Sequence, residues 1–322
     1  MTGSWRRAEL AGVALLVLGA LALFLAAPTY PNYDAYYHLV WGRELLDGLT
    51  PSFEAYAAPT QHPLEVAVAA VLGAVLGTGA DRAFVLIAVL SLVWLAWAVF
   101  RLGARVLGPW PGVAGAFFAA SSFSLLLLAA RGYRDVPFLA LVFWAAVRLV
   151  EGRSDRSVMA LLVVAGLLRP EAWILAGLLA LWRRSPALLA AAFVAPALWC
   201  LVDLAVTGDP LRSLTGTSEL AEELGRERGI ENVPSAFVTF VADALRPPVA
   251  LMAVAGLAVA WWKLGWRQLI VPLALLGAGI ATFVGTGVAG LSILPRYLTV
   301  PTVALCLFAG YAVAGFTTLP RT

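Results

Sequence analysis

The sequence predicts an all-α polytopic membrane protein, and its composition and patterning both support that fold class. Of its 322 residues, 61% are hydrophobic and 13% are charged, whereas soluble domains carry about 25% charged residues. The apolar residues form continuous runs, unlike the short alternating segments of an outer-membrane barrel, so the spans should be helices. At roughly 20 residues per crossing, the length allows about ten membrane helices in a single transmembrane domain over residues 1–322. No room remains for a sizeable soluble nucleotide-binding module.

The first apolar run covers residues 10–27 and follows Arg6 and Arg7. The run is long for the core of a signal peptide. Because basic residues mark the cytoplasmic flanks of membrane helices, we expect a retained first helix with a cytoplasmic N-terminus. Residues 30–82 then form the first external loop. Within it, residues 34–47 have the helical spacing of an interfacial helix, and residues 64–76 are too few to cross a bilayer.

The later apolar runs alternate between the two faces of the membrane, with basic residues on the cytoplasmic side. Residues 158–182 leave two interpretations open: one span with Arg169 and Glu171 inside it, or two short helices that meet at Pro170 near the outer face. Basic residues flank both ends and favour the hairpin, and Pro170 supplies no amide hydrogen to continue a helix. With the hairpin, both termini are cytoplasmic. The other predicted spans cover residues 83–100, 109–130, 136–150, 187–206, 249–262, 269–289 and 297–315.

Residues 207–247 form a long external loop in this topology. Glu222 and Arg226 lie four residues apart, which favours a helix over residues 218–229. We favour a solvated surface helix here. The alternative is a flap over the functional site, because long ordered loops often cover such sites.

Ionisable side chains gather on the predicted external face, where we expect them to share one polar cavity. Charged groups at membrane depth cost several kcal/mol unless they are paired or hydrated. Single residues also have structural interpretations: Asp34 and Asp135 could each cap a helix, and Asp135 could pair with Arg131 or Arg134. Their convergence on one face favours a functional role. The residues concerned are Asp34, His38, Glu54, His62, Glu65, Arg131, Arg134, Asp135, Arg169, Glu171, Arg296 and Tyr297.

Such a set of side chains suits one class of reaction. A carboxylate beside an acceptor hydroxyl can act as a general base. Arginines opposite it can hold a phosphate and stabilise the charge of a leaving group. A lipid-linked donor would enter sideways from the bilayer, so no nucleotide site is needed.

Several segments, in this order and spacing, resemble the GT-C class of integral-membrane glycosyltransferases. YPNYDAYYHLVWGRELLDG, residues 30–48, resembles the first external loop of that class, and DAYYHL within it is similar to archaeal oligosaccharyltransferases. HPL, residues 62–64, resembles the start of the second interfacial helix in the aminoarabinose-transferase and protein-mannosyltransferase-like branch. The later segments RGYRDVPF, GLLRPEAW and LPRYLTVP, which begin at residues 131, 166 and 294, are similar to later motifs of the class.

The resemblance implies a GT-C-like bundle in the plasma membrane, with interfacial helices in the first external loop and an extracytoplasmic active site. The implied reaction is an inverting transfer of one sugar from a polyprenyl-phosphate carrier to an unknown acceptor. The lipid bilayer is a further partner and nucleic acid is not. Asp34 would be the catalytic base, and Asp135 would assist it. No cofactor is certain, although Asp34 and Asp135 could hold a divalent metal ion.

The resemblance also assigns binding residues. Candidates for the lipid phosphate are Arg131, Arg134, Arg169 and Arg296. Candidates for substrate binding are Tyr37, His38, His62, Glu171 and Tyr297.

The chain also departs from the family pattern. Ala35 follows Asp34 where many relatives have a second acidic residue. A WWDYG-like motif and a C-terminal soluble domain are absent, so sequon glycosylation is not expected. The alternative function is a multi-pass transporter or a lipid-carrier-binding protein without transferase turnover. Transporters often contain internal repeats, and the two halves of this sequence show no convincing repeat.

Overall fold

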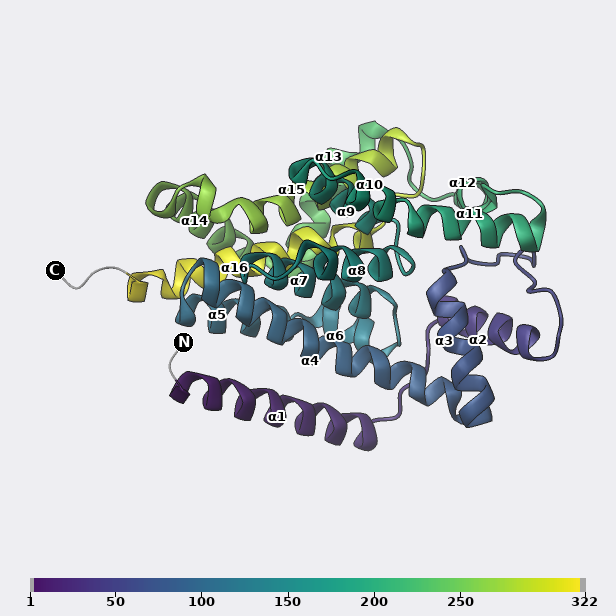
Figure 1. The fold of residues 1–322 in the computed structure, drawn as a ribbon, viewed down its shortest axis with the longest axis horizontal. Coiled ribbons are helices and arrows are strands. Elements are labelled where there is room, and N and C mark those ends of the chain that lie inside the picture. The colour runs from purple at the N-terminus through teal and green to yellow at the C-terminus, as the bar shows by residue number, and fades with distance from the viewer. Residues whose placement is uncertain (1–2, 319–322) are drawn as a thin grey trace.

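The computed structural model describes residues 3–318, which form helices joined by turns and loops, with no β-strand among them (Figure 1). The ends of the predicted domain, residues 1–2 and 319–322, lie outside the described part. The first half contains α1 (Gly3–Ala26), α2 (Tyr33–Leu46), α3 (Pro63–Leu76), η1 (Gly77–Gly79), α4 (Ala80–Val106), α5 (Pro109–Ala120), α6 (Phe123–Ala130), α7 (Asp135–Val150) and α8 (Asp155–Gly166). The second half contains α9 (Glu171–Arg183), α10 (Pro186–Ala192), α11 (Val194–Thr207), α12 (Arg212–Glu223), η2 (Ile230–Asn232), α13 (Val233–Leu245), α14 (Pro247–Leu264), α15 (Trp266–Val288), η3 (Pro295–Leu298), α16 (Thr299–Ala314) and η4 (Gly315–Thr318).

The all-α membrane class predicted from the sequence is confirmed, but the count of about ten spans is not. Six helical stretches of the described chain are long and apolar enough to cross a membrane, or seven if α5 and α6 form one bent span. Helices α7, α8 and α9 have 16, 12 and 13 residues. They are shorter than the roughly 20 residues that a full crossing needs.

Helices α16 and α7 form the centre of the bundle. Every residue of α16 from Val300 to Tyr311 is buried, and Figure 1 shows this helix running between α5 and α14. Small residues permit the close contact. A Cβ atom added at Gly256 of α14 would lie 1.9 Å from the carbonyl oxygen of Phe308 in α16. The core therefore depends on glycine where two helix backbones meet.

Both helices predicted in the first external loop are present, as α2 and α3. A Cβ atom added at Gly42 of α2 would lie 2.6 Å from the backbone nitrogen of Ala70 in α3, so the two helices pack closely. The apolar stretch from α3 through α4 has 44 residues and would extend about 66 Å as one straight helix. It is interrupted at η1 instead, where Gly77 adopts a φ of 54° that favours glycine. Figure 1 shows α2, α3, α11 and α12 together at one end of the molecule.

Residues 109–130, predicted as one span, form two helices with a bend between them. Helices α5 and α6 meet at an angle of 56°. At the break, the Ser121 hydroxyl donates to the carbonyl oxygen of Phe117 at 2.7 Å. Serine side chains that bond to the preceding turn in this way often bend helices.

The hairpin interpretation of residues 158–182 is confirmed. The Arg183 Nε donates to a carboxylate oxygen of Asp155 at 3.1 Å, so the end of α9 lies beside the start of α8. Between these ends, Val158 and Leu162 of α8 pack in one apolar cluster with Leu179 of α9. The turn at residues 167–170 therefore lies at the opposite end of the pair.

The helix predicted over residues 218–229 is misplaced. Helix α12 covers Arg212–Glu223 instead, and Gly225 follows it with a φ of 56°. Such a left-handed residue commonly ends a helix. Glu222 therefore pairs with Arg228 at 3.5 Å, and not with Arg226. Helix α13 was not predicted.

The contact between α14 and α16 yields a first prediction. Gly256→Ala should lower the free energy of unfolding by roughly 1–3 kcal/mol, because the added methyl group overpacks a backbone contact. Gly277→Ala in α15 is the matched control, since nothing lies within 4 Å of its added Cβ. Thermal unfolding of both purified variants in detergent measures the difference. Equal stability of the two variants would contradict the packing described here.

Candidate functional site

The first turn of α2 leaves the Asp34 carboxylate free for tertiary partners. Asn32, and not Asp34, caps this helix, because its Oδ1 accepts from the Ala35 N–H at 3.2 Å. The backbone N–H and Nδ2 of Asn32 donate to the carbonyl oxygen of Arg131 at 2.8 and 3.1 Å. These bonds fasten the start of α2 to the loop before α7. The capping interpretation of Asp34 is therefore wrong.

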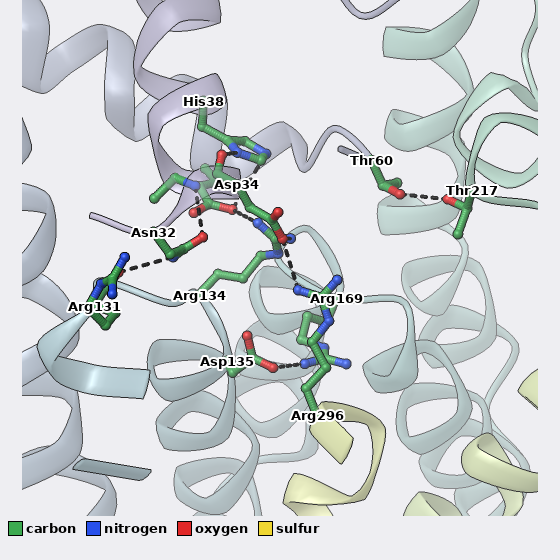
Figure 2. Close-up of polar contacts among 12 residues, drawn as sticks. Asn32, Asp34, His38, Thr60, Arg131, Arg134, Asp135, Arg169, Thr217 and Arg296 are labelled. Atoms are coloured by element: carbon green, nitrogen blue, oxygen red, sulfur yellow. Dashed lines mark hydrogen bonds and ion pairs between the residues drawn. The ribbon is translucent and has the colours of Figure 1, made fainter. Parts of the chain in front are cut away.

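Two arginines from distant parts of the chain share the Asp34 carboxylate. The Arg134 Nη2 donates to its Oδ2 at 2.8 Å, and the Arg296 Nη1 donates to the same oxygen at 2.9 Å (Figure 2). Arg134 also donates to Glu65 of α3 at 2.8 Å. Charge-assisted bonds of this kind are stronger than neutral ones. They join α2 and α3 to the residues that precede α7 and α16.

A second set of ion pairs lies beside the first. Arg169, in the turn between α8 and α9, donates to Asp135 at the start of α7 and to Glu171 at the start of α9. Asp135 and Arg169 are both buried. The interpretation that Asp135 pairs with Arg131 or Arg134 is therefore wrong. Arg169 reaches Asp135 because the hairpin turn lies against the start of α7.

The turn that carries Arg169 has a clear physical cause. Pro170 has no N–H and cannot donate to the carbonyl oxygen of Gly166, four residues earlier. Two indoles satisfy that oxygen instead: Nε1 of Trp173 donates at 3.0 Å and Nε1 of Trp199 at 3.1 Å. The break is thus stabilised by side chains of α9 and α11.

Arg296 connects the two sets of ion pairs. It lies in η3, before α16, and the charges of both Asp34 and Asp135 act on it. The ring centre of the next residue, Tyr297, is 5.4 Å from the Arg169 guanidinium carbon. The side chains of Asp34 and Arg296 are 16% and 27% exposed, whereas that of Arg169 is 5% exposed. The cluster is therefore closely packed and is open to its surroundings mainly at Asp34 and Arg296.

Burial and charge act in opposite directions on Asp34. Burial disfavours its ionised form, but the guanidinium groups of Arg134 and Arg296 outweigh burial and hold the pKa of that carboxyl below its usual range. Asp34 is consequently ionised at neutral pH.

Both histidines of the chain lie behind Asp34. His38 Nδ1 is 2.6 Å from the carbonyl oxygen of Asp34, and its Nε2 is 3.5 Å from Glu65. The His62 ring centre is 5.5 Å from that of His38 and 5.1 Å from that of Trp199. Burial lowers the pKa of both histidines, and the positive charge of Arg134 lowers them further. They are therefore neutral at pH 7.

Two predicted site residues lie apart from the ion pairs. The Arg131 guanidinium stacks on the ring of Tyr30, 4.2 Å from its centre. The Tyr37 hydroxyl donates to the carbonyl oxygen of Tyr56 at 3.0 Å. Conversely, the sequence did not assign a role to Glu65, which contacts both Arg134 and His38. Its position in the first turn of α3 favours an acid, but its burial depends on α7, which no local pattern reveals.

Several buried polar atoms of the cluster have no hydrogen-bond partner. Buried polar groups are nearly always bonded, so these atoms mark where a polar ligand or solvent can bind. In the described part of the chain they include His38 Nε2, His62 Nδ1, Glu65 Oε1, Asp135 Oδ2 and Glu171 Oε2.

The residues do not fit the divalent metal site considered from the sequence. No group of three or more His, Cys, Asp or Glu side chains within residues 3–318 could hold a metal ion. Asp34 and Asp135 each have one oxygen bonded to guanidinium groups, whose positive charge repels a cation. Divalent ions need several free oxygen ligands.

Comparisons with known proteins agree with this architecture. No protein-family model and no curated protein sequence matches the chain. The structure is similar to the crystal structure of ArnT from Cupriavidus metallidurans bound to undecaprenyl phosphate, with a TM-score of 0.63 and 15% sequence identity. The fold is ArnT-like. The match covers 97% of this chain and 60% of the ArnT chain, so this chain spans about three fifths of that protein. The GT-C-like fold class predicted from the sequence is confirmed.

The buried histidines yield a second prediction, on pH. Their pKa values are lower in the folded chain than the ordinary value of about 6.5, so the unfolded chain binds more protons below that pH. Stability should be complete above about pH 6.5 and should fall towards pH 5, by at most about 1.4 kcal/mol per pH unit for each histidine. Thermal unfolding in detergent from pH 7.5 to 5 measures this dependence.

The control is the variant His62→Gln, which cannot titrate in this range. It should show a shallower loss of stability between pH 7 and 5 than the unmodified protein. An equally steep loss would show that His62 is not kept neutral by burial.

Proposed function

We propose that the chain is a membrane glycosyltransferase that moves one sugar from a polyprenyl-phosphate carrier to an acceptor at the extracytoplasmic face. The observation that carries the proposal is the Asp34 carboxylate held between Arg134 and Arg296 at one end of an ArnT-like bundle. The structure of ArnT holds undecaprenyl phosphate. A general base beside phosphate-binding groups is what such a transfer needs.

Arg296 is the best-placed group for the carrier phosphate. It is more exposed than Arg134 or Arg169, and guanidinium groups bind phosphate through paired hydrogen bonds. Arg134, Arg169 and Arg296 already pair with carboxylates, so a phosphate must compete for them. When Arg296 turns from Asp34 to the phosphate, Asp34 loses one of its two positive partners and becomes a stronger base.

The transfer then proceeds in one displacement. The acceptor hydroxyl oxygen attacks the anomeric carbon of the sugar while a carboxylate oxygen of Asp34 takes its proton. The bond between that carbon and the phosphate oxygen breaks, and the phosphate leaves with the electron pair. Arg296 and Arg169 stabilise the charge that develops on it. Attack from the side opposite the leaving group inverts the anomeric configuration.

The other residues position these groups. Asp135 and Glu171 hold Arg169, and Glu65 holds Arg134 against Asp34. The neutral His38 ring packs against the backbone of Asp34. We assign substrate-binding roles to Glu171 and Tyr297, beside Arg169, and positioning roles to the buried His38 and His62.

Charge distribution supports an extracytoplasmic site. Basic residues gather where α4 and α7 end, opposite the Asp34 end, and Arg101 there pairs with Glu9 and Glu151. Lys263 and Arg267 flank the turn between α14 and α15. Basic loops face the cytoplasm in plasma-membrane proteins. Asp34 then lies outside the cell, and both termini lie inside.

The base yields a third prediction. Asp34→Asn should lower transfer from a polyprenyl-phosphate sugar by roughly 10²–10⁴-fold, because removal of a general base has effects of that size. The measurement is product formation by the full-length protein in lipid nanodiscs. Asp47→Asn is the matched control at the other end of α2, where Asp47 is exposed and pairs only with Arg43.

Asp47→Asn should keep the activity of the unmodified protein. Equal activity of a folded Asp34→Asn variant would eliminate the assigned base. Movement of a substrate across the membrane without a covalent product would favour a transporter instead.

The phosphate contact yields a fourth prediction. Arg296→Gln should raise the Kd for undecaprenyl phosphate by roughly 10–100-fold, because a charged hydrogen bond contributes about 1.5–3 kcal/mol. Arg131→Gln, at the same end of the molecule but outside the ion pairs, should change the Kd by less than about threefold. Calorimetric titration of the nanodisc protein measures both values. Equal effects of the two substitutions would contradict the assignment.

A further inference from the structure

A second polar cleft lies beside the ion-pair cluster, between residues 53–61 of the first external loop and helix α12. Its volume is about 270 Å³, and Asp203 of α11 lies on its wall. At its edge the hydroxyls of Thr60 and Thr217 are 2.6 Å apart, and Figure 2 shows this pair separate from the Asp34 cluster. The transfer chemistry described above does not use this cleft.

Asp203 is a buried carboxylate without a cationic partner in the described part of the chain. It is 2% exposed and accepts only from neutral donors. Gln61 Nε2 donates to it at 3.0 Å, the Ser213 hydroxyl at 2.8 Å and the Ser213 N–H at 2.8 Å. Arg212, the basic residue of the cleft, pairs with Glu54 at 3.6 Å and Glu219 at 3.1 Å instead. These neutral donors hold the Asp203 carboxyl group at the cleft wall.

The other ionisable residues that line the cleft are mostly acidic. Four carboxylates face one guanidinium in the cleft: those of Glu54, Asp203, Glu219 and Glu223, against Arg212. In the neighbouring cluster, by contrast, the carboxylates are paired with the guanidinium groups of Arg134, Arg169 and Arg296.

Gln61 provides an independent sign of a ligand. It lines the cleft and is 3% exposed, and its Oε1 has no hydrogen-bond partner. A buried amide oxygen of this kind needs a donor. Gln61 also connects the cleft to the base: the next residue, His62, lies against His38, whose ring contacts the backbone of Asp34.

We propose that this cleft binds the acceptor of the transfer, and that it takes an uncharged or cationic group rich in O–H or N–H donors. Hydroxyls of a neutral glycan and protonated amines share this chemistry. Acceptors that carry phosphate or carboxylate groups would be repelled by the acidic lining. The inference rests on the proposed function, because it assigns the second substrate of the same site.

Binding of three tetrasaccharides tests the proposal without any sugar donor. The full-length protein in phosphatidylcholine nanodiscs is titrated with N-acetylated chitotetraose, which is neutral, with its deacetylated cationic form, and with anionic tetragalacturonate. The neutral or the cationic probe should bind at least roughly tenfold more tightly than the anionic probe. Preference for the neutral form would assign glycan hydroxyls, and preference for the cationic form would assign amines. Failure of both to bind, or equal binding of tetragalacturonate, would overturn the proposal.

A pair of substitutions on α12 makes the test specific. Glu223 lines the cleft and Glu222 does not, although both are exposed. Glu223→Arg should weaken binding of the cationic probe by roughly fivefold and strengthen binding of tetragalacturonate, a gain that misfolding cannot produce. Glu222→Arg makes the same change in net charge and should alter both by less than about twofold. Identical effects of the two variants would contradict the assignment of the cleft.

The binding result and the transferase result can fail separately. Charge discrimination with no sugar transfer under any condition would overturn the proposed function and leave a polar binding cleft. Transfer from a polyprenyl-phosphate sugar without charge discrimination among the probes would leave the transferase and remove the acceptor role of this cleft.

Discussion

The shared carboxylate of Asp34 holds one end of the molecule together. Arg134 precedes α7 and Arg296 precedes α16, the two helices at the centre of the bundle, while Asp34 belongs to α2. Removing one partner of a buried ion pair costs about 3–5 kcal/mol, because the remaining charge stays buried. The position of α2 and α3 on the bundle therefore depends on the same interaction that determines the charge state of Asp34.

The end of the bundle that carries Asp34 combines two neighbouring sites, the ion-pair cluster and the acidic cleft. Asp34 and Arg296 are partly exposed in the ion-pair cluster, and four carboxylates and one guanidinium group line the cleft. His38, His62 and Gln61 connect them. An anionic donor and a neutral or cationic acceptor would each be directed to its own site, with Asp34 between them. The two substrates of the proposed transfer would thus bind at separate sites, and neither site needs a nucleotide-binding domain.

Much of this arrangement could be predicted from the sequence. Charged residues at the ends of apolar runs have few possible partners other than one another. Asp34, Arg169 and Arg296 were recognised in this way, and Pro170 with its basic flanks indicated the hairpin. The pairing of Asp135 with Arg169 was not foreseen, since it depends on how the hairpin turn packs on α7. The burial of Asp203 depends on the docking of α12 in the same way, and no periodicity reveals it.

The binding position of the carrier phosphate is the most direct test of the proposed transfer. A cryo-electron microscopy structure of the full-length protein in nanodiscs with undecaprenyl phosphate would locate it. We expect the phosphate within hydrogen-bond distance of Arg296 and Arg169, with Arg296 turned away from Asp34 and Arg134 still bonded to it. A phosphate bound elsewhere, with the bond between Arg296 and Asp34 intact, would contradict the central claim.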